Sequence, residues 1–169
     1  LNGALLRSAE HLRSEVATLV FTPDRLAVVK GGPAARRAYL DRVLGRLYPS
    51  RAALPLEYGV AVGQRNAALR RAAVGASSRE AITPWTLQVA QLGSALIAAR
   101  RDTVDLLTPA FAERAGELGL PDAVLAYDPQ PLTVDALEQR LDRDLERGTT
   151  GLGPHLEDVV RRCRGRPTS

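Results

Sequence analysis

The chain has 169 residues, of which 45% are hydrophobic and 25% are charged, a balance that predicts a globular fold and excludes a disordered chain. Its formal charge of +4 is compatible with a polyanionic partner. Lys30 is the only lysine among 23 basic residues, and we attribute part of the arginine excess to GC-rich coding. The single cysteine, Cys163, excludes an internal disulfide and a cysteine-based zinc site and favours a cytoplasmic protein, and no apolar run approaches the roughly 20 residues that cross a bilayer.

The first predicted element is a buried strand over residues 16–21, because this apolar run ends at the turn residues 22–24. Residues 26–29 are expected to extend the same sheet edge. The segment 31–33 then predicts the start of a helix with proline at its first position. An apolar stripe follows along that helix, at Tyr39, Leu40, Val43, Leu44 and Leu47.

Two further helices are predicted on either side of the polar connector 75–83. The first covers residues 51–73 and has one apolar face, which the polar residues 64–66 interrupt. The second begins at Pro84, and Pro109 is expected to kink or stop it just before that proline. Two long antiparallel helices joined by a short polar turn form an arm.

The last part of the chain predicts a strand, a helix and a hairpin. Residues 122–128 are expected to form a strand that returns to the sheet. A helix follows, with Thr133 as its N-cap and Gly148 as its end. This helix is expected to direct three arginines outward, namely Arg140, Arg143 and Arg147. A hairpin turn is predicted at residues 164–167.

Three short motifs occur in a fixed order: GGPAARRAYLD at 31–41, VGQRNAALRR at 62–71 and RGTTGLGPHLEDVV at 147–160. The sequence FTPD at 21–24 precedes the first of them. Their order, and the helical sequence between them, resemble the RecF family of bacterial recombination-repair ATPases of the ABC/SMC type. The residues that carry this resemblance are Thr22, Pro23, Asp24, Gly31, Gly32, Pro33, Asp41, Gln64, Asn66, Gly148, Thr149, Thr150, Gly153, Pro154, His155 and Asp158.

The chain departs from the family pattern at Leu156, where a basic residue is usual, and at Glu157, where aspartate is common, while Asp158 keeps the second acidic position. It contains no G-x-x-x-x-G-K-[ST] phosphate loop, and we find no ABC signature and no Walker B strand. Because it also starts at Leu1 and contains no methionine, we expect an internal fragment that is catalytically inactive alone. The resemblance implies that ATP and Mg²⁺ bind only to the full-length family member.

The resemblance implies an α/β fold that is predominantly helical and forms part of an ABC/SMC-type ATPase head with an inserted antiparallel helical lobe. Residues 1–30 would be a partial head with the strands of lobe I. Residues 31–121 would form the helical lobe II, or arm. Residues 122–169 would hold the return strand, the helix and the hairpin that lead back toward the head.

The function that the resemblance implies is DNA repair. A family member would bind DNA at junctions of single and double strands in an ATP-dependent manner, during gap repair, replication restart and SOS induction. It would act as an ATP-dependent homodimer in the cytoplasm, away from membranes, with the recombination mediators RecR and RecO as partners.

The candidate DNA contacts are arginines. Arg36 and Arg37 lie in the first turns of a helix, where positive charge opposes the helix dipole, so each is expected to have an anionic partner. That partner is either a phosphate or a carboxylate such as Asp41, four residues after Arg37. The arginines predicted to contact DNA are Arg36, Arg37, Arg65, Arg70, Arg71, Arg100 and Arg101. The alternative for those on the arm is a solvated face of ion pairs.

No catalytic, cofactor-binding or metal-binding residue is assigned. His155 with Asp158 would suit general-base catalysis, but no nucleophile motif accompanies them, and a self-contained hydrolase is disfavoured. Two alternatives to the RecF interpretation stay open: a free-standing helical adaptor that binds a protein, and a lobe of another SMC-like ATPase. A phosphate loop upstream and a Walker B strand downstream in the flanking coding sequence would distinguish them.

Overall fold

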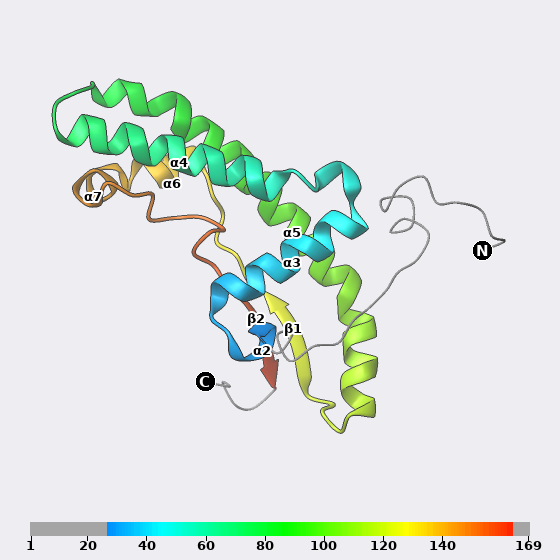
Figure 1. Cartoon of the computed structure of the whole chain (residues 1–169). Helices are drawn as coiled ribbons and strands as arrows, with labels where there is room; N and C mark the ends of the chain where they lie inside the picture. The colour runs from blue at the N-terminus through cyan, green and yellow to red at the C-terminus, as the bar shows by residue number, and fades with distance from the viewer. Residues whose placement is uncertain (1–26, 164–169) are drawn as a thin grey trace.

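The computed structural model describes residues 27–163 as a predominantly helical α/β arrangement, which confirms the predicted fold class (Figure 1). In chain order the elements are α2 (Ala27–Lys30), α3 (Pro33–Leu47), η2 (Pro49–Arg51), α4 (Leu54–Ala73), η3 (Arg79–Ile82), α5 (Thr83–Glu117), β1 (Ala123–Tyr127), α6 (Val134–Glu138), α7 (Leu141–Arg147) and β2 (Val159–Cys163). The strand predicted at 16–21, the turn at 22–24 and the hairpin at 164–167 lie outside the described residues.

The arm is an antiparallel pair of helices, α4 and α5, as the sequence predicts (Figure 1). Their facing sides bury apolar residues in one core cluster, which includes Tyr58, Val62, Val89 and Leu96. At Gly93 the helices approach so closely that a Cβ atom would overlap Leu132 and lie 2.9 Å from a ring carbon of Tyr58. The α5 position 93 is therefore restricted to glycine by the packing of the arm.

Helix α5 is the long element that joins the two ends of the molecule, with 35 residues and a length of about 52 Å. Pro109 was expected to kink or stop this helix, and it does not stop it, because the helix continues to Glu117. Proline deprives the carbonyl of Asp105 of its helical partner, but Asp105 and Pro109 are both exposed, so water can hydrate that carbonyl. The proline is thus tolerated on the solvent face of the helix.

The segment 26–29, expected to extend a sheet edge, is also different. Residues Ala27–Lys30 form the short helix α2, which packs beside α3. A four-residue apolar run has no periodicity that distinguishes a helix from a strand, so its neighbours in the fold decide its conformation.

Within residues 27–163 the sheet has two antiparallel strands, β1 and β2, with Ala123 opposite Cys163 and Tyr127 opposite Val159. Strand β1 confirms the predicted return strand at 122–128. A second core cluster lies between this sheet, α3 and the distal half of α5, and is formed by Leu40, Val104 and Val159, with Leu125 and Tyr127 packed against it.

The predicted single helix after Thr133 is two short helices, α6 and α7, with a turn at 139–140. Thr133 is the N-cap as predicted, because its Oγ1 accepts a hydrogen bond of 3.1 Å from the amide of Ala136. The helix breaks where the carbonyl of Leu137 faces Arg65 Nη2 at 3.5 Å instead of continuing a helical ladder. Leu132 and Leu137 belong to the core of the arm. The predicted domain boundaries after residues 30 and 121 stay predictions.

Two of the three arginines expected to point outward from this region, Arg143 and Arg147, are exposed. Arg140 is not, since it is partly buried and its guanidinium packs against Gly151. Its Nε is buried without a hydrogen-bond partner among residues 27–163. Arg140 lies three residues after Leu137 and four before Asp144, both of which are buried, so it falls on the inward side of this region.

Candidate functional site

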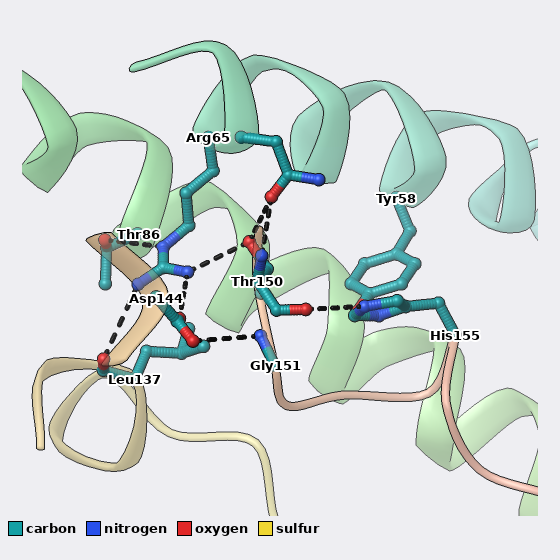
Figure 2. Close-up of polar contacts among 9 residues, drawn as sticks. Tyr58, Arg65, Thr86, Leu137, Asp144, Thr150, Gly151 and His155 are labelled. Carbon is teal, nitrogen blue, oxygen red and sulfur yellow. Dashed lines mark hydrogen bonds and ion pairs between the residues drawn. The ribbon is translucent and has the colours of Figure 1, made fainter. Parts of the chain in front are cut away.

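The three motifs meet around residues 148–158, here called the return loop, which connects α7 to β2 (Figure 1). Figure 2 shows polar contacts between α4 and this loop. The loop starts at Gly148, whose φ of 64° ends α7 in a left-handed conformation. The Gly148 amide bonds the Leu145 carbonyl and the Thr149 amide bonds the Asp144 carbonyl, the pair of hydrogen bonds that defines a Schellman motif. This confirms Gly148 as the helix end predicted from the sequence.

Arg65 fills the space between α4, α5 and α7, and Figure 2 shows it reaching from α4 toward Asp144 and Thr150. Its side chain is completely buried, and Nη1 lies 2.7 Å from Asp144 Oδ2 and 2.9 Å from Thr150 Oγ1. Nε donates to Thr86 Oγ1 at 3.1 Å. The other Asp144 oxygen accepts from the amide of Gly151 at 3.0 Å. A buried ion pair of this kind is tolerated because both partners are fully hydrogen-bonded.

Asn66, the next residue of the second motif, fixes the backbone of the return loop. Its Oδ1 accepts hydrogen bonds of 2.7 Å from both the amide and the hydroxyl of Thr150. Gln64 of the same motif is exposed and lies on the opposite side of α4. In the second motif, Arg65 and Asn66 therefore contact the return loop, and Gln64 faces the solvent.

His155 occupies a buried polar contact with Tyr58. The tyrosine hydroxyl lies 2.7 Å from Nδ1, and Nε2 lies 3.1 Å from the carbonyl oxygen of Thr150. Because a carbonyl only accepts, Nε2 carries the hydrogen and Nδ1 accepts from Tyr58. Burial lowers the pKa of His155 and raises the pKa of Tyr58, so both groups are held neutral. Gly153, with φ of 129°, lies against the same hydroxyl, where a Cβ atom would overlap it.

The first motif holds the end of the return loop. Arg36 binds Asp158 through two hydrogen bonds, Nε to Oδ1 at 2.8 Å and Nη2 to Oδ2 at 2.6 Å. The hydrogen bond from Arg36 lowers the pKa of Asp158. Arg37 donates from Nη1 to the carbonyl oxygen of Glu157 at 2.7 Å. Because Asp158 is paired with Arg36, it does not orient His155, and the general-base pair considered from the sequence is not formed.

Arg100, on α5, completes the set of contacts. Nε and Nη2 bind the two carboxylate oxygens of Asp41 at 2.8 and 2.9 Å, and Nη1 donates to the Pro154 carbonyl at 2.7 Å. Asp41 is thus the partner of Arg100, and the suggestion that it pairs with Arg37 is wrong. The local spacing of four residues is overridden by a partner from another helix.

Glu157 connects the return loop to β1 and the segment after it. Its carboxylate accepts from the Tyr127 hydroxyl at 2.8 Å and from the amide of Gln130 at 3.2 Å. Burial, followed by this hydrogen bond, raises the pKa of Tyr127. Leu156, by contrast, is 57% exposed, so the basic residue usual in the family would face solvent at this position.

These contacts divide the seven arginines predicted to bind DNA. The expectation that Arg65 and Arg100 reach phosphates is corrected, because they are 0% and 3% exposed and are occupied by carboxylates. Arg36 and Arg37 are partly buried and engaged with the return loop. The exposed candidates are Arg70, Arg71 and Arg101.

The exposed candidates lie at two levels along the arm. Arg65 on α4 lies beside Thr86 in the first turn of α5, so Arg71, further along α4, lies near the tip of the arm. Arg101 lies opposite residues 50–51, because its neighbour Asp102 pairs with Arg51. About 20 residues of α4 separate the two levels, roughly 30 Å along the helix. Arg70 also supports the loop, since Nη1 donates to the Gly148 carbonyl at 3.2 Å.

Asp144, Thr86 and Tyr58 were not predicted as polar partners, although the sequence holds one signal for the buried ion pair. Arg65 falls on the apolar face of α4, seven residues after Tyr58 and four before Leu69. A charged residue on a buried stripe requires a buried partner. Asp144, three residues after Leu141, is the matching carboxylate on α7.

The remaining motif residues have local roles or lie outside the described part. Thr22, Pro23 and Asp24 fall outside it. The Gly31 carbonyl accepts from Arg36 Nη1 at 2.6 Å, and Gly32 and Pro33 begin α3 as predicted. Within residues 27–163, no group of three or more His, Cys, Asp or Glu side chains is placed to hold a metal ion. No helix in that part is both long and apolar enough to cross a membrane.

Comparisons with known proteins identify relatives over nearly the whole chain, although no protein-family model matches it. The chain is 36% identical to the DNA replication and repair protein RecF of Acidothermus cellulolyticus, over 99% of its own length and 50% of that relative. It is 38% identical to RecF of Anaeromyxobacter dehalogenans strain 2CP-C, over 95% of the chain and 47% of the relative. The chain thus spans about half the length of the curated relatives it matches.

Solved structures share the fold. One, of the recombination mediator protein RecF-ATPrS in the RecFOR pathway, superposes with a TM-score of 0.79 at 21% identity and covers 98% of the chain and 48% of its own length. A second, of RecF-ATP in the same pathway, gives a TM-score of 0.75 at 22% identity, covering 97% and 48%. At this level of identity the likeness establishes the arrangement of helices and strands.

Proposed function

We propose, on the premise that this chain is RecF-like over nearly its whole length, that it works as the helical arm of a DNA replication and repair protein and as the connection from that arm to an ATPase head. The names of the relatives support DNA repair as the process. The proposal also includes DNA binding, dependence on ATP, and roles in gap repair, replication restart and SOS induction.

The observation that carries the proposal is the convergence of all three motifs on the return loop. Arg36 from α3, Arg65 from α4 and Arg100 from α5 each bind this loop or its neighbouring carboxylates. The loop leads directly into β2, on the side of the molecule that holds the sheet (Figure 1). These contacts hold the arm at a fixed angle to the sheet, which suits an element that must position DNA relative to a head domain.

DNA would be held through phosphates on the outside of the arm. Arg70, Arg71 and Arg101 are exposed, and exposed arginines bind phosphates without reading the base sequence. Because Arg71 and Arg101 lie roughly 30 Å apart along α4 and α5, a duplex that contacts both would run along the arm for about nine base pairs. Binding at a junction of single and double strands is the part of the proposal that comes from the family resemblance.

ATP and Mg²⁺ would belong to the whole protein and not to this arm. The chain has no phosphate loop, and residues 27–163 offer no cluster of metal ligands, so the residues in hand do not fit a nucleotide site. The proposal includes ATP-dependent dimerisation of the whole protein, RecR-like and RecO-like mediators as partners, and a cytoplasmic setting where the DNA would lie.

A binding experiment on the full-length protein with ATP present tests the DNA part. We expect the variant Arg71→Gln/Arg101→Gln to lose affinity equally for unrelated duplex sequences with a single-stranded overhang. Each lost phosphate contact should lower the slope of log affinity against log salt by about 0.9. The matched control is Arg114→Gln, an exposed arginine whose ion pair with Glu117 lies elsewhere, on the distal end of α5.

Wild-type affinity and slope in the double variant would contradict the DNA assignment. If that variant instead lost binding to a protein partner, the arm would be an adaptor surface, which is the alternative left open by the sequence.

A further inference from the structure

The outer face of α4 carries an apolar stripe that the fold does not use. On the side of α4 opposite its buried face lie Leu56, Val60, Gly63 and the partly buried Ala67, and Val74 follows at the helix end. Leu56 is 74% exposed, Val60 57% and Val74 78%. A surface helix normally directs polar residues to this side, so apolar residues on both faces indicate that α4 packs against a second partner.

The spacing of the stripe fits another helix. Leu56, Val60, Gly63 and Ala67, here called the seam, are separated by four, three and four residues, the steps that keep side chains on one face of a helix, where a second helix can pack along them. Gly63 lies at the middle of this seam, and the space beyond its Cα is open, with no atom within 4 Å of where a Cβ would lie. A glycine at this position lets a second helix backbone approach closely.

The charges beside the stripe indicate which helix that is. Glu57, Gln64 and Arg71 follow one another at intervals of seven residues, so they lie along one flank of the seam. In an antiparallel pair of identical helices the same flank of each copy meets that of the other, and charges on the flanks set the orientation of the pair. With a twofold axis beside Gly63 and Gln64, Glu57 of each copy meets Arg71 of the other, and Val60 meets Ala67.

We propose that α4 is a self-association surface, on which the seam Leu56, Val60, Gly63 and Ala67 packs antiparallel against the same seam of a second copy of this chain. The contact is self-complementary, as a twofold interface requires. It does not involve a nucleotide, so it differs from the ATP-dependent dimer in the proposed function. It uses the exposed Gln64 of the second motif, which the return loop leaves free on the outer side of α4.

The expected strength is modest. A helix of 20 residues is about 30 Å long, and one such seam buries less than the roughly 800 Å² per partner of a standard interface. We therefore expect a dimer with a dissociation constant in the micromolar range or weaker, populated at high protein concentration.

Sedimentation of the 169-residue chain over a wide concentration range, without nucleotide, measures this association. We expect a monomer–dimer equilibrium that Val60→Lys weakens at least tenfold. The matched control is Leu106→Lys, because Leu106 is also a helical residue and is 55% exposed, nearly the same as Val60, but lies on the distal half of α5. Circular dichroism of each variant verifies that the helices are intact.

A charge exchange separates this proposal from DNA binding. Glu57→Arg and Arg71→Glu should each weaken the dimer several-fold, and the double variant should recover it, because the pair is restored with its signs reversed. DNA binding would not recover in the double variant, since Arg71 would still be replaced.

Three outcomes would overturn the proposal. The chain could stay monomeric at every concentration, or Leu106→Lys could weaken the dimer as much as Val60→Lys does. The third is a monomeric chain in which Val60→Lys abolishes a complex with a different protein, which would assign the surface to that protein. The DNA proposal would be untouched by any of these results.

Discussion

Asp144→Asn is expected to lower the free energy of unfolding by about 3–5 kcal/mol, because removal of one partner leaves the other as an uncompensated buried charge. Arg65 and Asp144 have side chains that are 0% and 1% exposed, so water cannot replace the lost carboxylate. The other Arg65 partners, Thr86 and Thr150, are neutral hydroxyls. The asparagine would also present amide hydrogens to donors on Arg65 or Gly151.

Urea unfolding of the 169-residue chain measures this loss. With a urea dependence of about 2 kcal/mol per molar, a loss of this size lowers the unfolding midpoint by about 1.5–2.5 M. The matched control is Asp142→Asn, on the same helix. Asp142 pairs with Arg79 at the surface, where the side chains are 84% and 57% exposed, so its replacement should cost less than about 1 kcal/mol.

Equal effects of the two substitutions would refute the interpretation, because they would mean that Arg65 is solvated or that Asp144 is uncharged in the folded chain. A second comparison tests the pairing itself. The double variant Arg65→Met/Asp144→Leu should lose less unfolding free energy than the two single variants together. Each single variant leaves one buried charge without its partner, whereas the double variant leaves none.

Further predictions concern glycines and pH. Gly59→Ala should raise the free energy of unfolding by up to about 1 kcal/mol, because a Cβ there meets no atom within 4 Å. Gly93→Ala should lower it, because the added Cβ would overlap Leu132. Thermal unfolding compares the two variants, and equal stability would contradict the packing of the arm. Gly148→Ala should cost about 1 kcal/mol or more in urea unfolding, because φ is 64° there. Burial lowers the pKa of folded His155, so the unfolded chain takes up the proton first and stability should fall as pH drops below 6.5 toward that lowered pKa. Urea midpoints between neutral and mildly acidic pH should show a shallower fall in His155→Gln, and an unchanged profile would exclude this histidine as the cause.

Most of the helices were predictable because their signals are local. Apolar residues at helical spacing, proline at the first position of α3, the Thr133 cap and the glycine at 148 each act within a few residues of the chain. The same is true of the return strand β1. Such elements form in the same way whatever lies beyond them.

The local rules failed where a distant segment decided the outcome. Pro109 does not end α5, because its exposed face lets water replace the missing hydrogen bond while the other face continues along the sheet. The helix predicted after Thr133 breaks at residues 139–140, where Arg65 faces the Leu137 carbonyl. The short run that forms α2 contains no periodic pattern from which its conformation could be predicted.

By itself, the sequence determined the order of the three motifs, their resemblance to one family and the helical character of the arm. Only the tertiary structure decided what the arginines bind, because Arg36, Arg65 and Arg100 find their carboxylates at separations of 122, 79 and 59 residues. Sequence spacing suggests partners one helical turn apart, and it offered Asp41 as one of two possible partners of Arg37, whereas Asp41 pairs with Arg100. A charge that is buried on folding pairs with the carboxylate that the packing brings to it, since an unpaired charge inside the fold costs more than any local contact gains.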